Sequence, residues 1–286
     1  MLNFIKNLVS KFFIKKEIIL IDSLDKIEFF ISHLSKQSLL GLDTEFDWRN
    51  TYLPKLSLIQ ISSSTKIFLL DAIKIKDLSF LRSILEDKNK KIIMHASRSD
   101  TTVLSSNLNI YIENVFDIQI AEKIIFNNEI KNYGSIVKNH FNLDLEQSQT
   151  NSNWLKRPFS VNQISYAAED VSFLLPIYSK QLKILKKIGK LNSAFDQSYQ
   201  EAKKGNTSLH ITRLKKLKKA TDRQRKIFLW REEKAFSEDV PPSYIISDKN
   251  LNRLYKLNSK DANAIKKLNS FLGNSSLAED FKSQFL

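Results

Sequence analysis

Two carboxylates lie two residues apart after an apolar run in the first quarter of this sequence. Asp43 and Glu45 follow the run that starts at Ser38, and a strand there would place both carboxylates on one face. Adjacent ionised carboxylates repel each other, and each loses hydration when it is buried. A divalent cation between them offsets both effects, so the segment predicts a metal site with oxygen ligands.

Two further segments carry acidic side chains in positions that could join this site. Asp100 ends the segment that begins at His95, and Asp170 lies in a run predicted as a helix over 161–171 with Ser160 as its N-cap. Tyr166 precedes Asp170 by four residues and shares its helix face. Each segment alone also fits a strand end, a helix terminus or a surface pair. The three together favour one acidic site on an α/β domain.

Composition restricts the chemistry of that site. The 286 residues include no cysteine and only four histidines, which excludes disulfides, thiol nucleophiles and cysteine metal sites and argues against a histidine-rich one. Oxygen ligands remain, and these suit Mg²⁺ or Mn²⁺. The absence of cysteine also points to a reducing cytoplasm.

The net charge of +14 predicts a polyanionic partner. Residues 180–226 carry 15 Lys or Arg against three acids, so the excess is concentrated after the acidic segments. The alternative is a biased composition in which lysine fills any exposed position.

The order of apolar runs predicts a mixed α/β domain followed by helices. Strands are expected over 18–21, 39–45, 56–61, 67–71 and 91–94, and helices over 24–34 and 78–85. Helices are also expected over 227–236, from about 245 to 255, over 261–268 and over 278–285. We predict an N-terminal amphipathic helix over 1–16, a main domain over 17–188 and a helical domain over 209–286. Between these two domains, residues 189–208 are expected to form a linker, with a loosened helix pair as the alternative.

The acidic segments and their flanks resemble the DEDD exonuclease superfamily, in its tyrosine-bearing subgroup, and more closely ribonuclease D. The resemblance covers about residues 18–185 and is specific as a set. Its flanking segments are Leu53 to Ile61, His95-Ala96, Asn153 to Pro158, Tyr166 to Val171 and Leu174 to Pro176. It implies a ribonuclease H-like mixed sheet with flanking helices and a 3′-5′ exoribonuclease that uses two divalent cations.

The resemblance also implies roles for the site residues. Asp43 would bridge two cations, Glu45 and Asp170 would complete one site, and Asp100 would hold the other through water. Tyr166 would orient the attacking water, because its phenol is too weak a base at neutral pH. Substrates would be RNA 3′ ends, including tRNA precursors, and no small-molecule cofactor is expected.

Contacts to the nucleic acid strand are expected from side chains beside the acidic segments. Phe46 could stack on a terminal base, with core packing as the alternative. Trp154, Lys156 and Arg157 could contact the strand, although Trp154 could equally lie under the helix that carries Tyr166. Gln60 follows an apolar run and is consistent with a core amide whose hydrogen bonds are satisfied.

The segment after residue 209 resembles an HRDC domain, a helical module that binds nucleic acid. Trp230-Arg231-Glu232 before Pro241-Pro242 carries this fainter likeness, and a purely structural helical cap is the alternative. Three functional classes stay open: an exoribonuclease that acts as a cytoplasmic monomer, a DNA 3′-5′ exonuclease, and a non-catalytic scaffold. The scaffold would use the N-terminal helix for membrane contact, although packing against the main domain is the favoured role of that helix.

Overall fold

The computed structural model describes residues 16–127, 130–145, 149–258 and 263–286. The chain divides into two compact units. The first unit extends to Asp47 and continues from Lys55 to Asn206, and the second comprises Trp48–Pro54 and Thr207–Leu286. The chain therefore passes between the units three times.

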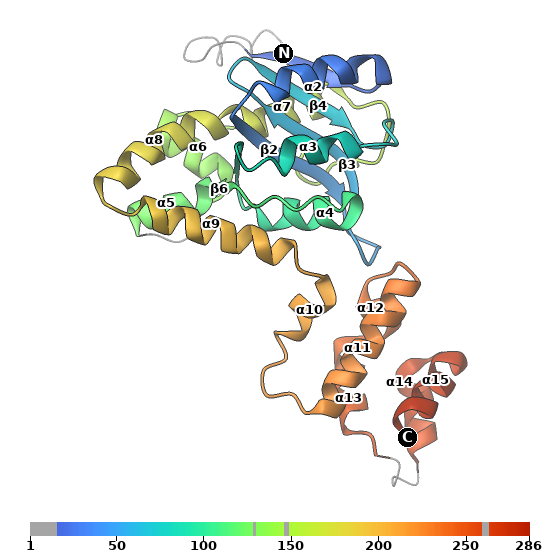
Figure 1. Cartoon of the computed structure of the whole chain (residues 1–286). Coiled ribbons are helices and arrows are strands. Elements are labelled where there is room, and N and C mark those ends of the chain that lie inside the picture. Colours follow the sequence, from blue (N-terminus) through green and yellow to red (C-terminus); the bar gives the residue numbers. More distant parts are fainter. Residues whose placement is uncertain (1–15, 128–129, 146–148, 259–262) are drawn as a thin grey trace. The chain divides into compact units, whose positions relative to one another are not determined.

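A mixed sheet forms the centre of the first unit (Figure 1). Among the described residues it has six strands in the order β1-β4-β3-β2-β5-β6. β2 pairs antiparallel with β3 on one side and parallel with β5 on the other. The strands are β1 (Glu17–Ile21), β2 (Leu39–Asp47), β3 (Lys55–Ser62), β4 (Lys66–Asp71), β5 (Lys91–Met94) and β6 (Val115–Asp117).

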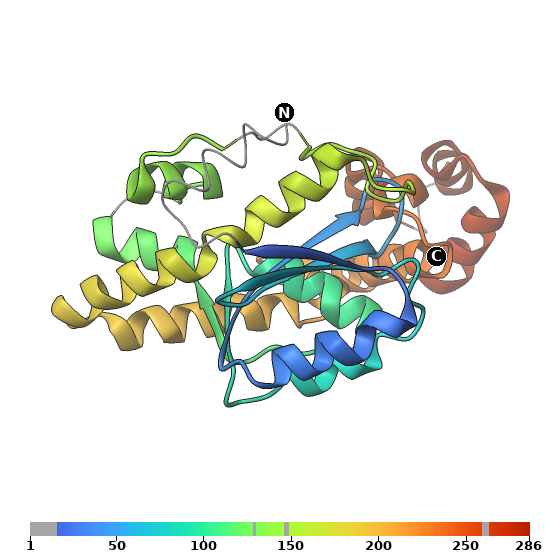
Figure 2. The same ribbon diagram turned by 90° about the horizontal axis from the view of Figure 1, so that it is seen from above.

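Helices cover both faces of this sheet (Figure 2). One apolar cluster joins the sheet to α2, α3 and α4 through buried side chains such as Phe30, Leu85 and Leu104. A second cluster joins the opposite face to the remaining helices through residues such as Ile118, Ile136 and Val171. The helices are α2 (Ile27–Ser35), α3 (Arg82–Leu85), α4 (Arg98–Leu108), α5 (Ile118–Phe126), α6 (Tyr133–Phe141), α7 (Val161–Ser172), α8 (Leu174–Lys187) and α9 (Leu191–Gly205), with 3₁₀ turns η1 (Leu24–Lys26) and η2 (Ser79–Leu81).

The expected strands and helices of the first unit are confirmed within a few residues at their ends. The expected linker over 189–208 was wrong, because α9 packs against α4 and β6 in the first unit. Its buried positions Ala194, Ser198, Ala202 and Gly205 are small and recur every three or four residues. A Cβ on Gly205 would meet Thr101 Oγ1 at 2.0 Å, so glycine is what lets α9 approach α4 this closely.

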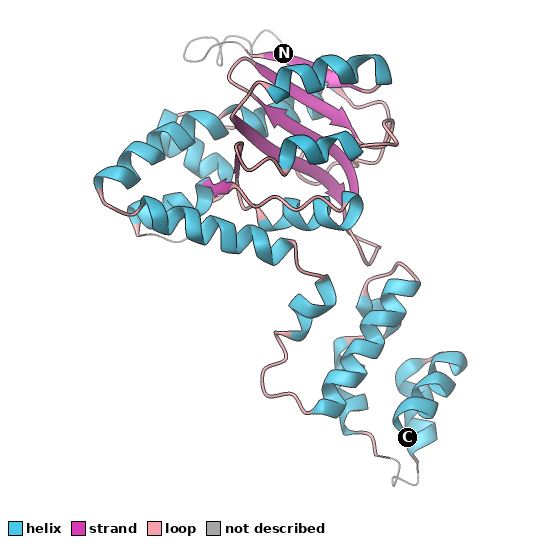
Figure 3. Ribbon diagram, in the orientation of Figure 1, coloured by secondary structure: helices cyan, strands magenta, loops and turns pink. Residues whose placement is uncertain are grey.

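The second unit contains only helices in the residues that are described (Figure 3). Trp230 is buried at its centre, where its indole packs edge-on against Phe281 and donates to Asp280 Oδ2 at 2.6 Å. The predicted helical character is confirmed. The helices are α10 (Leu209–Leu214), α11 (Asp222–Ser237), α12 (Pro242–Ile245), α13 (Asp248–Lys256), α14 (Ala264–Leu272) and α15 (Ser275–Phe285).

The predicted N-terminal helix falls on residues 1–16, of which only Lys16 is described. Among the described residues no helix is both long enough and apolar enough to cross a membrane.

The segment between β2 and β3 packs inside the second unit, which the sequence did not predict. Tyr52 is 4% exposed and donates its hydroxyl to Glu232 Oε2 at 2.8 Å. Arg213 Nη1 donates to the same carboxylate oxygen at 2.8 Å, and its guanidinium lies over the Tyr52 ring. The strand that carries Asp43 and Glu45 therefore continues into a segment anchored by α10 and α11.

We predict that Tyr52→Phe lowers the free energy of unfolding by about 1–3 kcal/mol, because the buried Glu232 carboxylate loses a donor. Tyr244→Phe is the matched control, since its hydroxyl contacts Asn50 in the same segment from a side chain that is 65% exposed. Its loss should stay below about 0.5 kcal/mol. Urea denaturation measures both, and equal losses would contradict the anchoring role.

Candidate metal and active site

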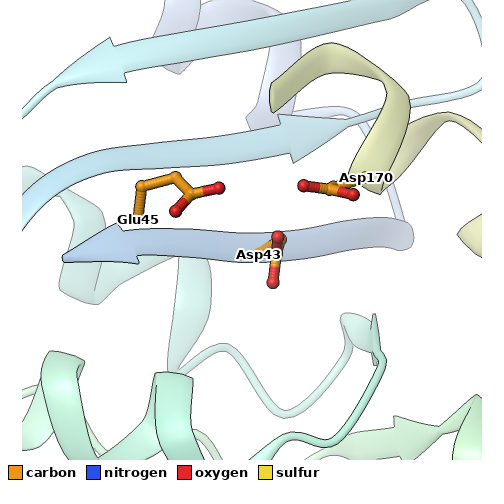
Figure 4. Close-up of side chains that lie close together, drawn as sticks. All are labelled: Asp43, Glu45 and Asp170. Atoms are coloured by element: carbon orange, nitrogen blue, oxygen red, sulfur yellow. The ribbon is translucent and has the colours of Figure 1, made fainter. Parts of the chain in front are cut away.

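Three carboxylates from two elements converge on one point in the first unit (Figure 4). Asp43 and Glu45 lie on β2, and Asp170 lies on α7, which packs across β2, β3 and β4. One carboxylate oxygen from each residue lies within 4.8 Å of the others. The structure thus brings together the pair predicted to share a strand face and the helix residue predicted to join it.

Local interactions fix the position of α7 over the sheet. Ser160 caps the helix by accepting from Gln163 N–H at 3.2 Å, and Gln163 returns a bond to Ser160 N–H, as the predicted N-cap requires. At the other end, Ser62 on β3 donates to the carbonyl of Val171 at 2.8 Å. These contacts hold Tyr166 and Asp170 over the sheet.

Asp100 reaches the site from α4 and is held by β2. β5 pairs with β2 only from Leu39 to Gly41, and beyond Gly41 no described strand pairs with β2 on that side. Asp100 Oδ1 accepts the Thr44 backbone N–H at 3.1 Å and the Thr44 hydroxyl at 2.6 Å. The carboxylate therefore substitutes for the missing strand, and its charge acts on Asp43 and Glu45. It is not one of the three carboxylates whose oxygens lie within 4.8 Å of one another.

Asp117 fixes the turn from which α4 starts. Its buried carboxylate accepts the backbone N–H groups of Ala96 at 3.2 Å and Ser97 at 2.8 Å, and it also caps α5 through Gln119 N–H. Ala96 adopts φ 53°, which costs energy for a residue with a Cβ. The two bonds stabilise this turn and so place α4 with Asp100.

The carboxyl groups of the site resist ionisation when no cation is present. Burial, followed by the charges of Asp170 and Asp100, raises the pKa of Glu45 to about 9. Burial and the charge of Glu169 raise the pKa of Asp170 to about 8. Burial raises the pKa of Asp100 to about 7 and also raises that of Asp43.

The donor set fits a divalent cation. Mg²⁺ and Mn²⁺ prefer carboxylate oxygens, and three such oxygens converge here. A cation among them would favour the ionised forms of these carboxyl groups, because its positive charge offsets the burial and negative charge that raise their pKa values. Asp43, Glu45 and Asp170 could hold it directly, and Asp100 lies in the same acidic cluster.

Tyr166 lies one helical turn before Asp170 at the edge of this cluster. Its hydroxyl lies 3.3 Å from Thr150 Oγ1. Burial and the charge of Asp170 raise the pKa of the Tyr166 phenol above its ordinary value. The phenol therefore stays protonated at neutral pH and can orient a water but not deprotonate it.

The residues expected to contact the nucleic acid strand have mixed surroundings. Trp154 is 2% exposed and packs against Phe159 and Tyr166, so the expected strand contact lacks exposed indole surface. Arg157 forms a two-bond ion pair with the buried Asp71 at 2.6 and 2.8 Å, which gives its guanidinium a structural role. The burial of Trp154 is the alternative that the sequence left open. The ion pair of Arg157 was not expected, because Asp71 is distant in sequence.

Phe46 and Lys156 keep more solvent access. Phe46 is partly exposed and packs against the apolar cluster beneath α2 and α3, after a bulge between Glu45 and Phe46. This is the core-packing alternative. Lys156 is exposed in the segment before α7, and its contact with the strand stays a prediction.

Two polar residues of β2 and β3 matter more than the sequence suggested. Thr44 orients Asp100. The only sign of this role in the sequence is that Thr44 lies between Asp43 and Glu45. The expectation that Gln60 is a core amide with satisfied hydrogen bonds is wrong. It is fully buried, and neither amide atom has a hydrogen-bond partner among the described residues.

Comparisons with known proteins agree with this geometry. The sequence profile of a 3′-5′ exonuclease family matches residues 18–186. Ribonuclease D of Desulfotalea psychrophila is 30% identical over 246 residues, which cover 80% of this chain and 64% of that protein. The chain thus spans less than two thirds of the length of this relative.

Solved structures share the fold. The crystal structure of Escherichia coli RNase D, described as an exoribonuclease involved in structured RNA processing, superposes with a TM-score of 0.79 at 25% identity and covers 93% of this chain and 72% of its own. Trypanosoma brucei RNase D in complex with RNA U12 gives a TM-score of 0.59 at 21% identity, with 68% and 72% coverage. The predicted mixed sheet with flanking helices is confirmed.

We predict that metal-free protein loses stability as the pH rises from about 4 to 8. The folded state retains the Asp170 proton up to a pKa of about 8, whereas the unfolded chain releases it near the ordinary value of 3.8. Unfolding then releases a proton, so the free energy of unfolding falls over this interval.

Asp170→Asn removes this titration and serves as the reference. Denaturation in EDTA at pH 5 and pH 8.5 should show the variant gaining more than about 1 kcal/mol relative to the parent at the higher pH. Adding Mg²⁺ should restore the stability of the parent at the higher pH. If the free energies of unfolding of parent and variant change by the same amount between the two pH values, the raised pKa of Asp170 would be contradicted.

Proposed function

Because the chain belongs to the 3′-5′ exonuclease family, we propose that it hydrolyses RNA from the 3′ end with divalent cations. The observation that supports this best is the convergence of Asp43, Glu45 and Asp170 within 4.8 Å. The cations would be two Mg²⁺ or Mn²⁺ ions. RNA is favoured over DNA because relatives at 27–30% identity are named ribonuclease D.

The substrate, the oligomeric state and the cellular compartment are part of the same proposal. We propose structured RNA 3′ ends, tRNA precursors among them, as substrates of a monomer in the cytoplasm. One described chain supplies all of the proposed site carboxylates, so the proposed site needs no second subunit. The cysteine-free sequence supports a reducing compartment.

The residues of the chain have separate tasks in this reaction. When bound, the cations activate water and stabilise the leaving 3′ oxygen. Asp43, Glu45 and Asp170 would hold them, and Thr44 orients Asp100 through two hydrogen bonds. Tyr166 keeps its proton and donates a hydrogen bond that orients the attacking water.

We propose that the second unit is an HRDC-like module that increases RNA capture. Its entry segment is strongly basic, and four lysines within five positions have exposed side chains. Such lysines bind phosphate without reading sequence. These residues are Lys215, Lys216, Lys218 and Lys219.

We predict that Asp43→Asn lowers Mg²⁺-dependent cleavage of 3′-labelled RNA by about 10³-fold or more, because a lost cation ligand removes several kcal/mol of transition-state stabilisation. Tyr166→Phe should lower kcat by about 10- to 100-fold and leave Mn²⁺ affinity unchanged. The control is Tyr111→Phe, an exposed tyrosine outside the site.

The same assay with matched single-stranded DNA decides the substrate class. Faster cleavage of the DNA would contradict the proposed RNA preference. A Tyr166→Phe variant with the turnover of the parent would remove Tyr166 from the mechanism.

We predict that changing these four lysines of the second unit together to glutamine weakens RNA binding and makes its salt dependence shallower. The slope of log K against log salt is negative. Its magnitude should fall by about 0.7 for each removed lysine that binds a phosphate in the parent. An unchanged affinity and slope would indicate a structural cap. The control variant changes four exposed lysines of α13–α15 to glutamine instead, namely Lys249, Lys256, Lys266 and Lys282.

A further inference from the structure

Gln60 is a buried amide on the sheet face that carries the metal site. In the antiparallel pairing of β2 and β3 it lies directly opposite Asp43. Residues paired in this way point to the same face with their Cβ atoms about 4.5–5.5 Å apart. The Gln60 side chain therefore starts beside the carboxylate that is central to the site.

The surroundings of Gln60 offer its amide little else to bind. On its other side β4 places the apolar Leu69 opposite Gln60. Two residues away on the same face, the Ser62 hydroxyl donates to the Val171 carbonyl of α7. Gln60 is 0% exposed, so bulk water does not reach it.

Both amide atoms of Gln60 have no hydrogen-bond partner in the described chain. A buried amide without partners is unfavourable, and an apolar side chain of similar size would avoid that cost. Because Gln60 lies opposite a site carboxylate, its amide is placed to gain a hydrogen-bond partner when a cation binds to the site.

We propose that Gln60 is a positioning residue that donates from its Nε2–H to the Asp43 carboxylate when a divalent cation binds there. This inference rests on the proposed function. Cation binding requires Asp43 to be ionised, and an ionised carboxylate accepts stronger hydrogen bonds than a neutral one. The bond would orient the carboxylate toward the cation, as hydrogen bonds to metal ligands commonly do.

Gln60→Met tests this inference, since it keeps the length of the side chain and removes the amide. Mn²⁺ binding to the full chain is measured by electron paramagnetic resonance or calorimetry, without substrate. We expect a loss of affinity of about 10-fold or more. Thermal unfolding in EDTA should show the variant at least as stable as the parent, because the amide makes no bond in the metal-free state.

Leu69→Met is the matched control, because it alters packing next to Gln60 on the same face and leaves the amide in place. It should bind Mn²⁺ like the parent. Turnover gives a second measurement, in which Gln60→Met should lower kcat and leave KM for RNA unchanged. A role in packing alone would not separate the two constants in this way.

The outcomes distinguish this inference from the proposed function. If Asp43→Asn binds Mn²⁺ like the parent, the proposed metal site itself is wrong. If Asp43→Asn loses binding while Gln60→Met keeps the affinity of the parent, only the role of Gln60 is overturned. If Gln60→Met and Gln60→Leu both unfold in EDTA, the amide is structural and the inference also fails.

Discussion

Repulsion and lost hydration among clustered carboxylates are the constraint on which the rest of the first unit depends. Burial and neighbouring negative charge raise the pKa values of Asp43, Glu45, Asp100 and Asp170. Such a cluster is unfavourable unless a cation joins it. The scaffold must therefore keep the acids buried and close together, whether they are protonated or bound to a cation, and β2, α4 and α7 do so from three directions.

The sheet makes room for the site by ending one pairing early. β5 leaves β2 after Gly41, and Asp100 accepts the Thr44 N–H that a neighbouring strand would otherwise have taken. The Asp100 side chain thus takes the place of a strand. It accepts the hydrogen bond of the Thr44 N–H and is also the fourth acid of the cluster. Farther along, the chain leaves β2 and enters the segment that Tyr52 anchors through Glu232 inside the second unit.

The sequence predicted the features that depend on short spacing. Asp43 and Glu45 on one strand, Ser160 as a helix cap, and Tyr166 one turn before Asp170 all follow from periods of two and about four residues. Features that depend on distant partners were missed. The ion pair of Arg157 with Asp71 and the packing of α9 against α4 join residues that no local pattern connects. Gln60 was misjudged because an amide in an apolar run carries no sign of whether a partner exists.

The central claim is that Asp43, Glu45 and Asp170 hold a divalent cation. Crystals of the protein soaked in Mn²⁺ test it most directly, because anomalous scattering locates manganese independently of the surrounding oxygen atoms. The account predicts an anomalous peak within about 2.0–2.6 Å of a carboxylate oxygen from each of these residues. Fully occupied manganese elsewhere on the chain, with these three carboxylates left without a peak, would contradict it.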